Sequence, residues 1–191
     1  MTRAFLLALF LLPVQDNTRI DEAVARFEKT WKKSREDHIR SGSIIRLTNL
    51  RDPKILAALS GKLPRERSPL LREKLVFAIG QYTESPEAAK ILFDELKKNR
   101  KNPNVIQVAL QQLGEMKQAL ARPRVKEVNP LIATRDLTLA VTAVRTLGFV
   151  RHKSSVLALI DRLRRCQQDM RKFIMGEKLP ILTVGLITSI E

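Results

Sequence analysis

Apolar residues recur along most of this chain at steps of three and four, the spacing that places them on one face of an α-helix. The pattern is clearest over residues 136–165, where one apolar stripe leads to Gly148 and a second begins at Val156 after a polar turn. Glycine favours the C-terminal end of a helix, so the first helix is predicted to end at Gly148. The stretch therefore predicts two short helices back to back, which need further hairpins alongside them to bury both apolar faces.

Similar hairpins can be followed back along the chain to residue 43. Helix starts are marked by a capping residue in front of a proline, a pairing that suits the first turn of a helix, at Asp52-Pro53, Ser68-Pro69, Ser85-Pro86 and Asn102-Pro103. Gly80, Gly114 and Gly148 are spaced by 34 residues, and each follows a large apolar residue. This period predicts an all-α fold, a right-handed α–α superhelix of about four hairpins, at 43–66, 68–100, 102–134 and 136–165.

Two parts of the pattern are irregular. Pro123 and Pro130 interrupt the second helix of the third hairpin, so Ala119 to Thr134 is predicted to be a broken or shortened helix. The break is either a tolerated irregularity or a kink that reshapes a binding surface. After the repeats, residues 166–191 are predicted to be a last helical segment and a short apolar tail, which either caps the array or begins a further repeat.

Residues 17–42 are predicted to form an N-terminal amphipathic capping helix. The spacing of its less polar residues gives one stripe: Ile20, Val24, Phe27, Trp31, Ser34 and His38. Phe27 and Trp31 are expected to seat this helix on the first hairpin, although an exposed, ligand-binding Trp31 is the alternative. His38 is expected to be a core or boundary residue rather than a catalyst.

The first 16 residues have the layout of a secretory signal peptide. Arg3 provides a basic start, and a nine-residue apolar run from Ala4 to Leu12 is too short to span a bilayer. This predicts a secreted or periplasmic protein with no transmembrane segment after processing. The segment lacks a small-x-small cleavage site, so an uncleaved anchor and a buried first helix of a cytoplasmic protein stay open.

Composition supports a helical domain with an affinity for negative charge. Apolar residues make up 44% of the 191-residue chain and aromatic residues 5%, which favours packed helices over β-sheets and argues against a disordered chain. The net charge of +15 implies attraction to polyanions. Cys166 is the single cysteine, which removes intrachain disulfides; it is either an ordinary helix residue or a thiol whose pKa is lowered by nearby arginines.

The string Ala143-Val144-Arg145-Thr146-Leu147-Gly148 resembles the end of the first helix of a HEAT repeat, the armadillo-like kind found in bacterial proteins and phycobilisome lyases. Leu50 to Leu59 resembles the turn and second helix of such a repeat. The resemblance covers about residues 43–165. It implies a HEAT-like solenoid that presents a surface to partners. Bilin lyase activity occurs in some relatives of this repeat, but no residue here identifies it.

The sequence contains no pattern that predicts catalysis, a cofactor or a metal site. The two histidines have no ligand-spaced histidine, cysteine or carboxylate beside them, and there is neither a glycine-rich phosphate loop nor a Gly-x-Ser-x-Gly elbow. We therefore expect a protein that is not an enzyme and that has no cofactor.

One feature with possible chemistry is basic clustering at the ends of second helices, where equivalent positions of a solenoid would align along one edge. The cations singled out are Lys97, Lys98, Arg100, Lys101, Arg162, Arg164 and Arg165. They are either contacts for a partner or polyanion, or cations that interact with helix dipoles and keep the edge soluble.

These observations leave three functional hypotheses. The first is a non-enzymatic, exported scaffold that holds a protein partner on a concave face built from second helices. The second is a solenoid that binds nucleic acid or another polyanion along its basic edge. The third is a lyase-like or chaperone-like subunit, which would carry a bound small molecule.

Overall fold

The structure is a computed structural model that describes residues 12–174, with side chains from 17 to 171. Within this range the chain forms α-helices and short 3-10 helices and has no strand, which confirms the predicted all-α class. Two compact units divide at Tyr82 and Thr83, and we describe each by itself. Most of the predicted signal peptide at 1–16, and the predicted tail after residue 174, lie outside the described residues.

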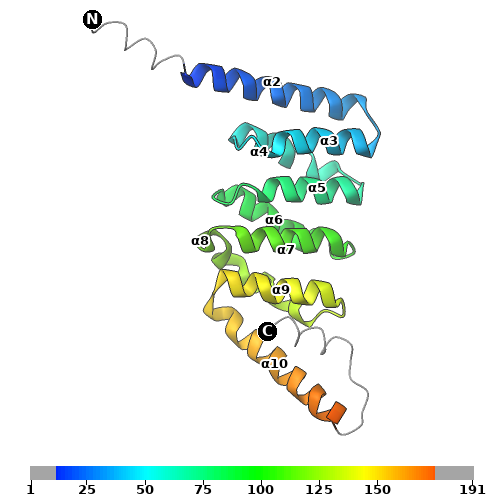
Figure 1. The fold of residues 1–191 in the computed structure, drawn as a ribbon, viewed down its shortest axis with the longest axis vertical. Helices are drawn as coiled ribbons and strands as arrows, with labels where there is room; N and C mark the ends of the chain where they lie inside the picture. The colour runs from blue at the N-terminus through cyan, green and yellow to red at the C-terminus, as the bar shows by residue number, and fades with distance from the viewer. Residues whose placement is uncertain (1–11, 175–191) are drawn as a thin grey trace, which may run out of the picture. The chain divides into compact units, whose positions relative to one another are not determined.

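Unit 1 consists of helices α2 (Leu12–Lys33), α3 (Asp37–Thr48), α4 (Pro53–Ser60), η1 (Leu63–Arg65) and α5 (Pro69–Gly80). α2 packs on α3 and α4, and α3 packs on α5 (Figure 1). The predicted helix starts are present: the Asp52 carboxylate accepts a hydrogen bond from the Lys54 amide, and the Ser68 hydroxyl accepts one from the Leu71 amide. Proline fills the first helical position in both places, where it removes no helical hydrogen bond.

The single helix predicted over 17–42 is instead two helices, because the chain leaves the helix at Ser34 and re-enters it at Asp37. The Ser34 hydroxyl accepts from the Glu36 amide, and the Ser34 carbonyl accepts from Nε of Arg40 at 2.8 Å. The Arg40 guanidinium also lies 5.1 Å from the centre of the Trp31 ring. His38 therefore does not continue the stripe of α2, and its side chain is 79% exposed. Phe27 is buried, as expected for an anchor.

Tyr82 ties the end of unit 1 to the turn between α3 and α4. Its hydroxyl donates to the carbonyls of Leu50 (3.0 Å) and Asp52 (3.2 Å), and burial raises its pKa to about 12. Because folding raises this pKa, the neutral phenol stabilises the native state. This stabilisation is fully present below the unfolded pKa of about 10 and is lost as the pH rises toward 12.

Tyr82→Phe is expected to lower the free energy of unfolding by about 1 kcal/mol at neutral pH, since two hydrogen bonds are removed. Urea unfolding followed by circular dichroism measures this difference. The gap between variant and wild type should shrink above about pH 10, because the wild type then loses the contribution of its neutral phenol. A difference in the free energy of unfolding that stays constant to pH 11 would contradict the raised pKa of Tyr82.

Unit 2 consists of α6 (Pro86–Lys98), α7 (Pro103–Glu115), α8 (Gln118–Ala121), η2 (Arg122–Glu127), η3 (Asn129–Ala133), α9 (Leu137–Val150) and α10 (Lys153–Ile174). α7 lies along α9, where the buried Thr146 hydroxyl donates to the Leu110 carbonyl at 2.8 Å (Figure 1). On the other side of α9, η3 packs between α9 and α10.

The broken second helix predicted in the third hairpin is confirmed. In place of one helix, the chain forms α8, η2 and η3 in succession. Pro123 and Pro130 each fill an early position of a 3-10 helix, where their missing amide hydrogens cost least. The result is a compact, irregular segment in the place of a second helix, and it shapes the surface described below.

Two predicted boundaries in the last hairpin differ from the structure. α9 continues past Gly148 to Val150 and ends at Arg151, which takes the left-handed conformation (φ 50°) while its amide donates to the Leu147 carbonyl. α10 is one helix from Lys153 to Ile174, with no end at the predicted boundary after residue 165. The buried Ser155 and Cys166 fall on one face of α10, so the same inward stripe continues across that boundary.

Gly148 is therefore a glycine inside a helix rather than a helix end. A Cβ added there would meet nothing within 4 Å. Gly148→Ala is expected to raise the free energy of unfolding by about 0.5–1 kcal/mol through helix propensity, measured by thermal or urea unfolding. The matched control is Gly61→Ala, whose Cβ would lie 3.2 Å from the Ala57 carbonyl oxygen and should give no gain.

Candidate functional site

A hollow of about 520 Å³ lies in unit 2 between the end of α6 and η3, and we call it the basic hollow. Its lining combines an apolar floor with two cations and one carboxylate: Leu96, Lys97, Arg100, Ile106, Glu127, Pro130, Leu131, Ala133, Thr134 and Leu139. The floor residues Leu96, Ile106 and Leu139 are buried, whereas Lys97 and Arg100 are exposed at the rim. The hollow thus offers apolar contact below and positive charge above.

The turn after α6 fixes the position of the rim cations. The Asn99 amide donates to the Glu95 carbonyl at 3.1 Å, and the Asn99 side chain donates to the Glu95 carboxylate at 2.6 Å. The Asn102 amide then donates to the Asn99 carbonyl at 2.7 Å, which closes the turn. Arg100 and Lys101 lie inside it, and among the described residues the side chains of Lys98, Arg100 and Lys101 have no hydrogen-bond or ion-pair partner.

Arg124 holds η2 against α6 beside the hollow. Its guanidinium donates to Asp94 at 2.8 Å and to Glu127 at 2.9 Å, and it lies 5.1 Å from the centre of the Phe93 ring. Burial alone would raise the pKa of Glu127, but the hydrogen bonds from Arg124 and Lys97 outweigh it and lower that pKa. Glu127 is therefore a carboxylate already neutralised by Arg124 and by Lys97, whose Nζ lies 3.3 Å away. The positive charge of Arg100 faces no opposing carboxylate of this kind.

The second predicted cluster lies on α10, next to the other side of η3. A pocket of about 190 Å³, the α10–η3 pocket, is lined by Asn129, Ile132, Ala133, Ala158, Asp161, Arg162 and Arg165. Ala133 lines this pocket and the basic hollow alike, so the two predicted clusters flank one segment. Arg164 points elsewhere: its side chain is 71% exposed and lies 3.7 Å from Asp161. Lys98, Lys101 and Arg164 line neither cavity.

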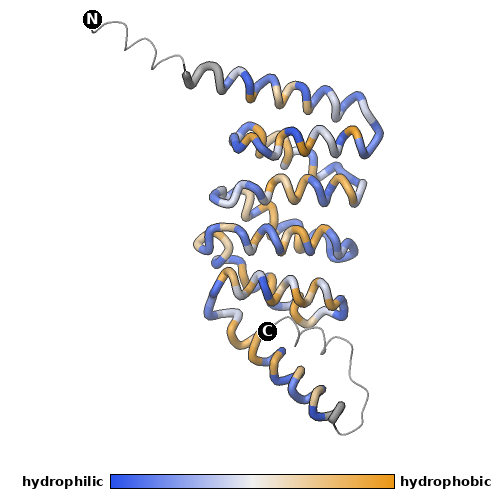
Figure 2. Tube along the Cα trace, in the orientation of Figure 1, coloured by the Kyte–Doolittle hydropathy of each residue, from blue (hydrophilic) through white to orange (hydrophobic). Residues whose placement is uncertain are grey.

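α10 also has an apolar exposed stretch near its start. Figure 2 shows an apolar stretch that follows the first polar residues of the helix, and a more hydrophilic second half. Val156, Leu157, Ile160 and Leu163 are all more than a third exposed. Apolar area next to the arginines of α10 is typical of surfaces that contact other proteins.

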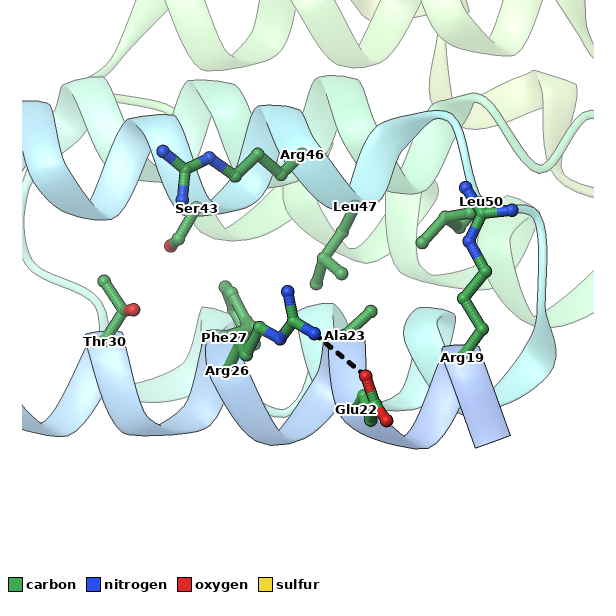
Figure 3. A pocket seen from close by; sticks show the side chains of 10 residues that line it. All are labelled: Arg19, Glu22, Ala23, Arg26, Phe27, Thr30, Ser43, Arg46, Leu47 and Leu50. Atoms are coloured by element: carbon green, nitrogen blue, oxygen red, sulfur yellow. Dashed lines mark hydrogen bonds and ion pairs between the residues drawn. The ribbon is translucent and has the colours of Figure 1, made fainter. Parts of the chain in front are cut away.

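A third basic feature, which was not predicted from the sequence, is a cleft of about 250 Å³ between α2 and α3 of unit 1. Figure 3 shows Ala23 and Leu47 pointing toward one another across it, with Phe27 beside them and Arg26 paired to Glu22 at 2.8 Å. Arg19 and Arg46 add positive charge to its lining. The seven-residue spacing of Arg19 and Arg26 on one helix is a visible signal in the sequence. The contribution of α3 cannot be seen in the sequence, because the place of α3 beside α2 depends on the break after Lys33.

Other candidate chemistry gains no support from the geometry. Among the described residues, no group of three or more histidine, cysteine, aspartate or glutamate side chains could hold a metal ion. Cys166 is buried, and burial raises its pKa against the opposing effect of Arg162, so an activated thiol is not favoured. Over the same part of the chain, no helix has the length and apolar character needed to cross a membrane.

Comparisons with known proteins give no relative to reason from. No family model matches the sequence, and neither a curated protein nor a solved structure matches it. We therefore infer the function from the residues and geometry of the cavities themselves.

Proposed function

We propose that this chain is a non-enzymatic, HEAT-like interaction scaffold whose basic hollow binds an acidic segment of a protein partner. The observation that carries the proposal is the pairing of a buried apolar floor with cations at the rim. A segment that alternates acidic and aliphatic side chains would bury the aliphatic ones against Leu96 and Ile106 and place its carboxylates near Arg100. The apolar contacts supply affinity, and the charges supply specificity and the rate of encounter.

The repeat architecture in this proposal has support within each unit. First helices of consecutive hairpins pack against one another, α3 on α5 in unit 1 and α7 on α9 in unit 2. In unit 2 the elements outside these first helices include α6, η2, η3 and α10; α6 and η2 line the basic hollow, α10 lines the α10–η3 pocket, and η3 lines both. Stacking of this kind is what a helical solenoid requires. The apolar N-terminal run supports a partner met after export, outside the cytoplasm.

Nucleic acid is the competing ligand, and the net charge of +15 favours it. Single-stranded nucleic acids, however, gain much of their affinity by stacking bases on aromatic side chains. The lining of the basic hollow contains aliphatic residues and no aromatic one among the described residues. An aliphatic floor fits leucine or isoleucine side chains better than it fits bases or sugars, so the acidic peptide is the ligand that the geometry favours.

A titration of the full chain with three fluorescent probes tests the proposal. The probes are a short peptide that alternates glutamate with leucine, an all-glutamate peptide of the same length and an oligothymidine of matched length. The alternating peptide should bind at least about tenfold more tightly than the all-glutamate peptide, since burying even one or two leucine side chains is worth more than 1.4 kcal/mol. Tightest binding of the oligothymidine, with a steep salt dependence, would favour the polyanion function instead.

A further inference from the structure

The α10–η3 pocket contains a partly buried arginine, Arg162, two of whose donor atoms have no partner. Nε and one Nη of Arg162 are both inaccessible to solvent, and neither has a hydrogen-bond partner. A buried donor without an acceptor costs free energy, so native proteins normally supply a partner, an ordered water or an ion. Arg162 is the exception among the basic residues singled out in the sequence, because the other six are exposed on the surface.

The unpartnered donors of Arg162 have the right arrangement for one class of ligand. Nε and an Nη of a guanidinium can present parallel N–H groups, which match the two oxygens of a carboxylate or a phosphate. The pocket of about 190 Å³ lies directly beside this side chain and is large enough for such a group. Arg165 adds a second positive charge to the lining, and Asp161 is the one carboxylate there among the described residues. Asp161 is 65% exposed and lies 3.7 Å from Arg164, so solvent and a third cation weaken its repulsion.

A neutral group in the same pocket also lacks a partner. Asn129 donates through its side-chain nitrogen to the Ser154 carbonyl at 3.2 Å, which leaves its Oδ1 buried and without a donor. This oxygen can accept a hydrogen bond from the hydroxyl of a hydrogen phosphate, or from water that accompanies a carboxylate. The pocket thus combines a donor pair for an anion with an acceptor for its protonated edge.

We propose that the α10–η3 pocket binds an oxyanion, a carboxylate or a phosphate, held in two-point contact by Arg162. This site lies on the opposite side of η3 from the basic hollow, and it does not depend on the peptide proposed for that hollow. The anion either is a small free ion or belongs to a larger molecule, and both share the chemistry that Arg162 recognises.

Thermal unfolding of the full chain at constant ionic strength tests the site, with sodium phosphate or sodium acetate replacing sodium chloride. Near-saturating anion should raise the Tm of the wild type by about 5 °C. Arg162→Gln should abolish this anion-specific rise, and its Tm in chloride should be no lower than that of the wild type because fewer buried donors are left without a partner. Arg171→Gln, on the same helix but exposed and not part of the pocket lining, is the matched control and should keep the full rise.

The anion that raises the Tm shows which chemical group the α10–η3 pocket binds. A response to phosphate alone indicates a phosphate group, and a response to acetate alone indicates a carboxylate. Arg162→Lys, which keeps the charge but loses the paired donors, should weaken phosphate binding at least about tenfold in calorimetric titration. The proposal is overturned if the wild type and Arg162→Gln respond equally to both anions, or if calorimetry detects no binding to the wild type.

Discussion

Arg100→Glu combined with Lys101→Glu is expected to weaken binding of the alternating glutamate–leucine peptide by at least about a hundredfold, or about 2.8 kcal/mol. Each substitution removes an attraction and adds a repulsion at a turn that has no compensating carboxylate. Lys97 is left intact because it pairs with Glu127, so the double variant should fold as the wild type does. Fluorescence anisotropy with the labelled peptide measures the effect.

The matched control for this variant carries the same change in net charge elsewhere on unit 2. Arg145 and Lys153 are exposed and do not line the basic hollow, so Arg145→Glu with Lys153→Glu should reduce affinity less than about threefold. The difference between the two double variants should shrink at high salt, since the rim charges are screened. Equal losses in both would mean that the peptide responds to net charge and not to the hollow.

Arg124→Met is expected to lower the free energy of unfolding by about 2–3 kcal/mol. Methionine keeps part of the packing on Phe93, but Asp94 and Glu127 lose their shared partner while partly buried. Urea unfolding by circular dichroism gives the value. Lys126→Met, an exposed substitution on the same segment, is the control and should change stability by less than about 0.5 kcal/mol.

The pH dependence of the stability lost in Arg124→Met distinguishes the charge of Arg124 from its packing. The folded-state pKa of Glu127 is lowered, so its ionised form stabilises the native state above the unfolded value of 4.5, and that stability is lost as the pH falls through the lower folded value. The difference in the free energy of unfolding between Arg124→Met and the wild type should therefore become smaller below about pH 4. A gap of constant size down to pH 3 would show that packing on Phe93, and not the carboxylates, supplies the effect.

Local signals in the sequence predicted much of the helical pattern. Polar residues in front of prolines marked the starts of α4, α5, α6 and α7, because this signal acts within one turn of helix; of these residues, Asn102 at α7 makes no side-chain cap hydrogen bond. Pro123 and Pro130 predicted the break of the third hairpin for the same reason. The end of α2 was missed because it depends on Arg40 reaching back to the Ser34 carbonyl and over Trp31. The helix end predicted at Gly148 was wrong, since a glycine is tolerated inside a helix whose neighbours pack well.

The candidate sites were only partly visible in the sequence. Lys97 and Arg100 stood out as part of a run of cations, but the apolar floor beneath them combines α6, α7, η3 and α9, and no local pattern relates those segments. The pairing of Arg124 with Glu127 is a local spacing, whereas its contact with Asp94 spans 30 residues. Arg162 is partly buried while Arg164 and Arg165 are exposed, because α10 packs on η3, a contact that no local pattern in the sequence predicts.

Hydrogen–deuterium exchange of the full chain, with and without saturating alternating peptide, tests the central claim most directly. We predict slower amide exchange at 96–101 and 129–134, the segments that form the rim and one wall of the basic hollow, and no change at 37–48. Protection confined to α2 and α3 of unit 1, or no protection at the concentration where anisotropy shows saturation, would contradict the assignment of the basic hollow as the binding site.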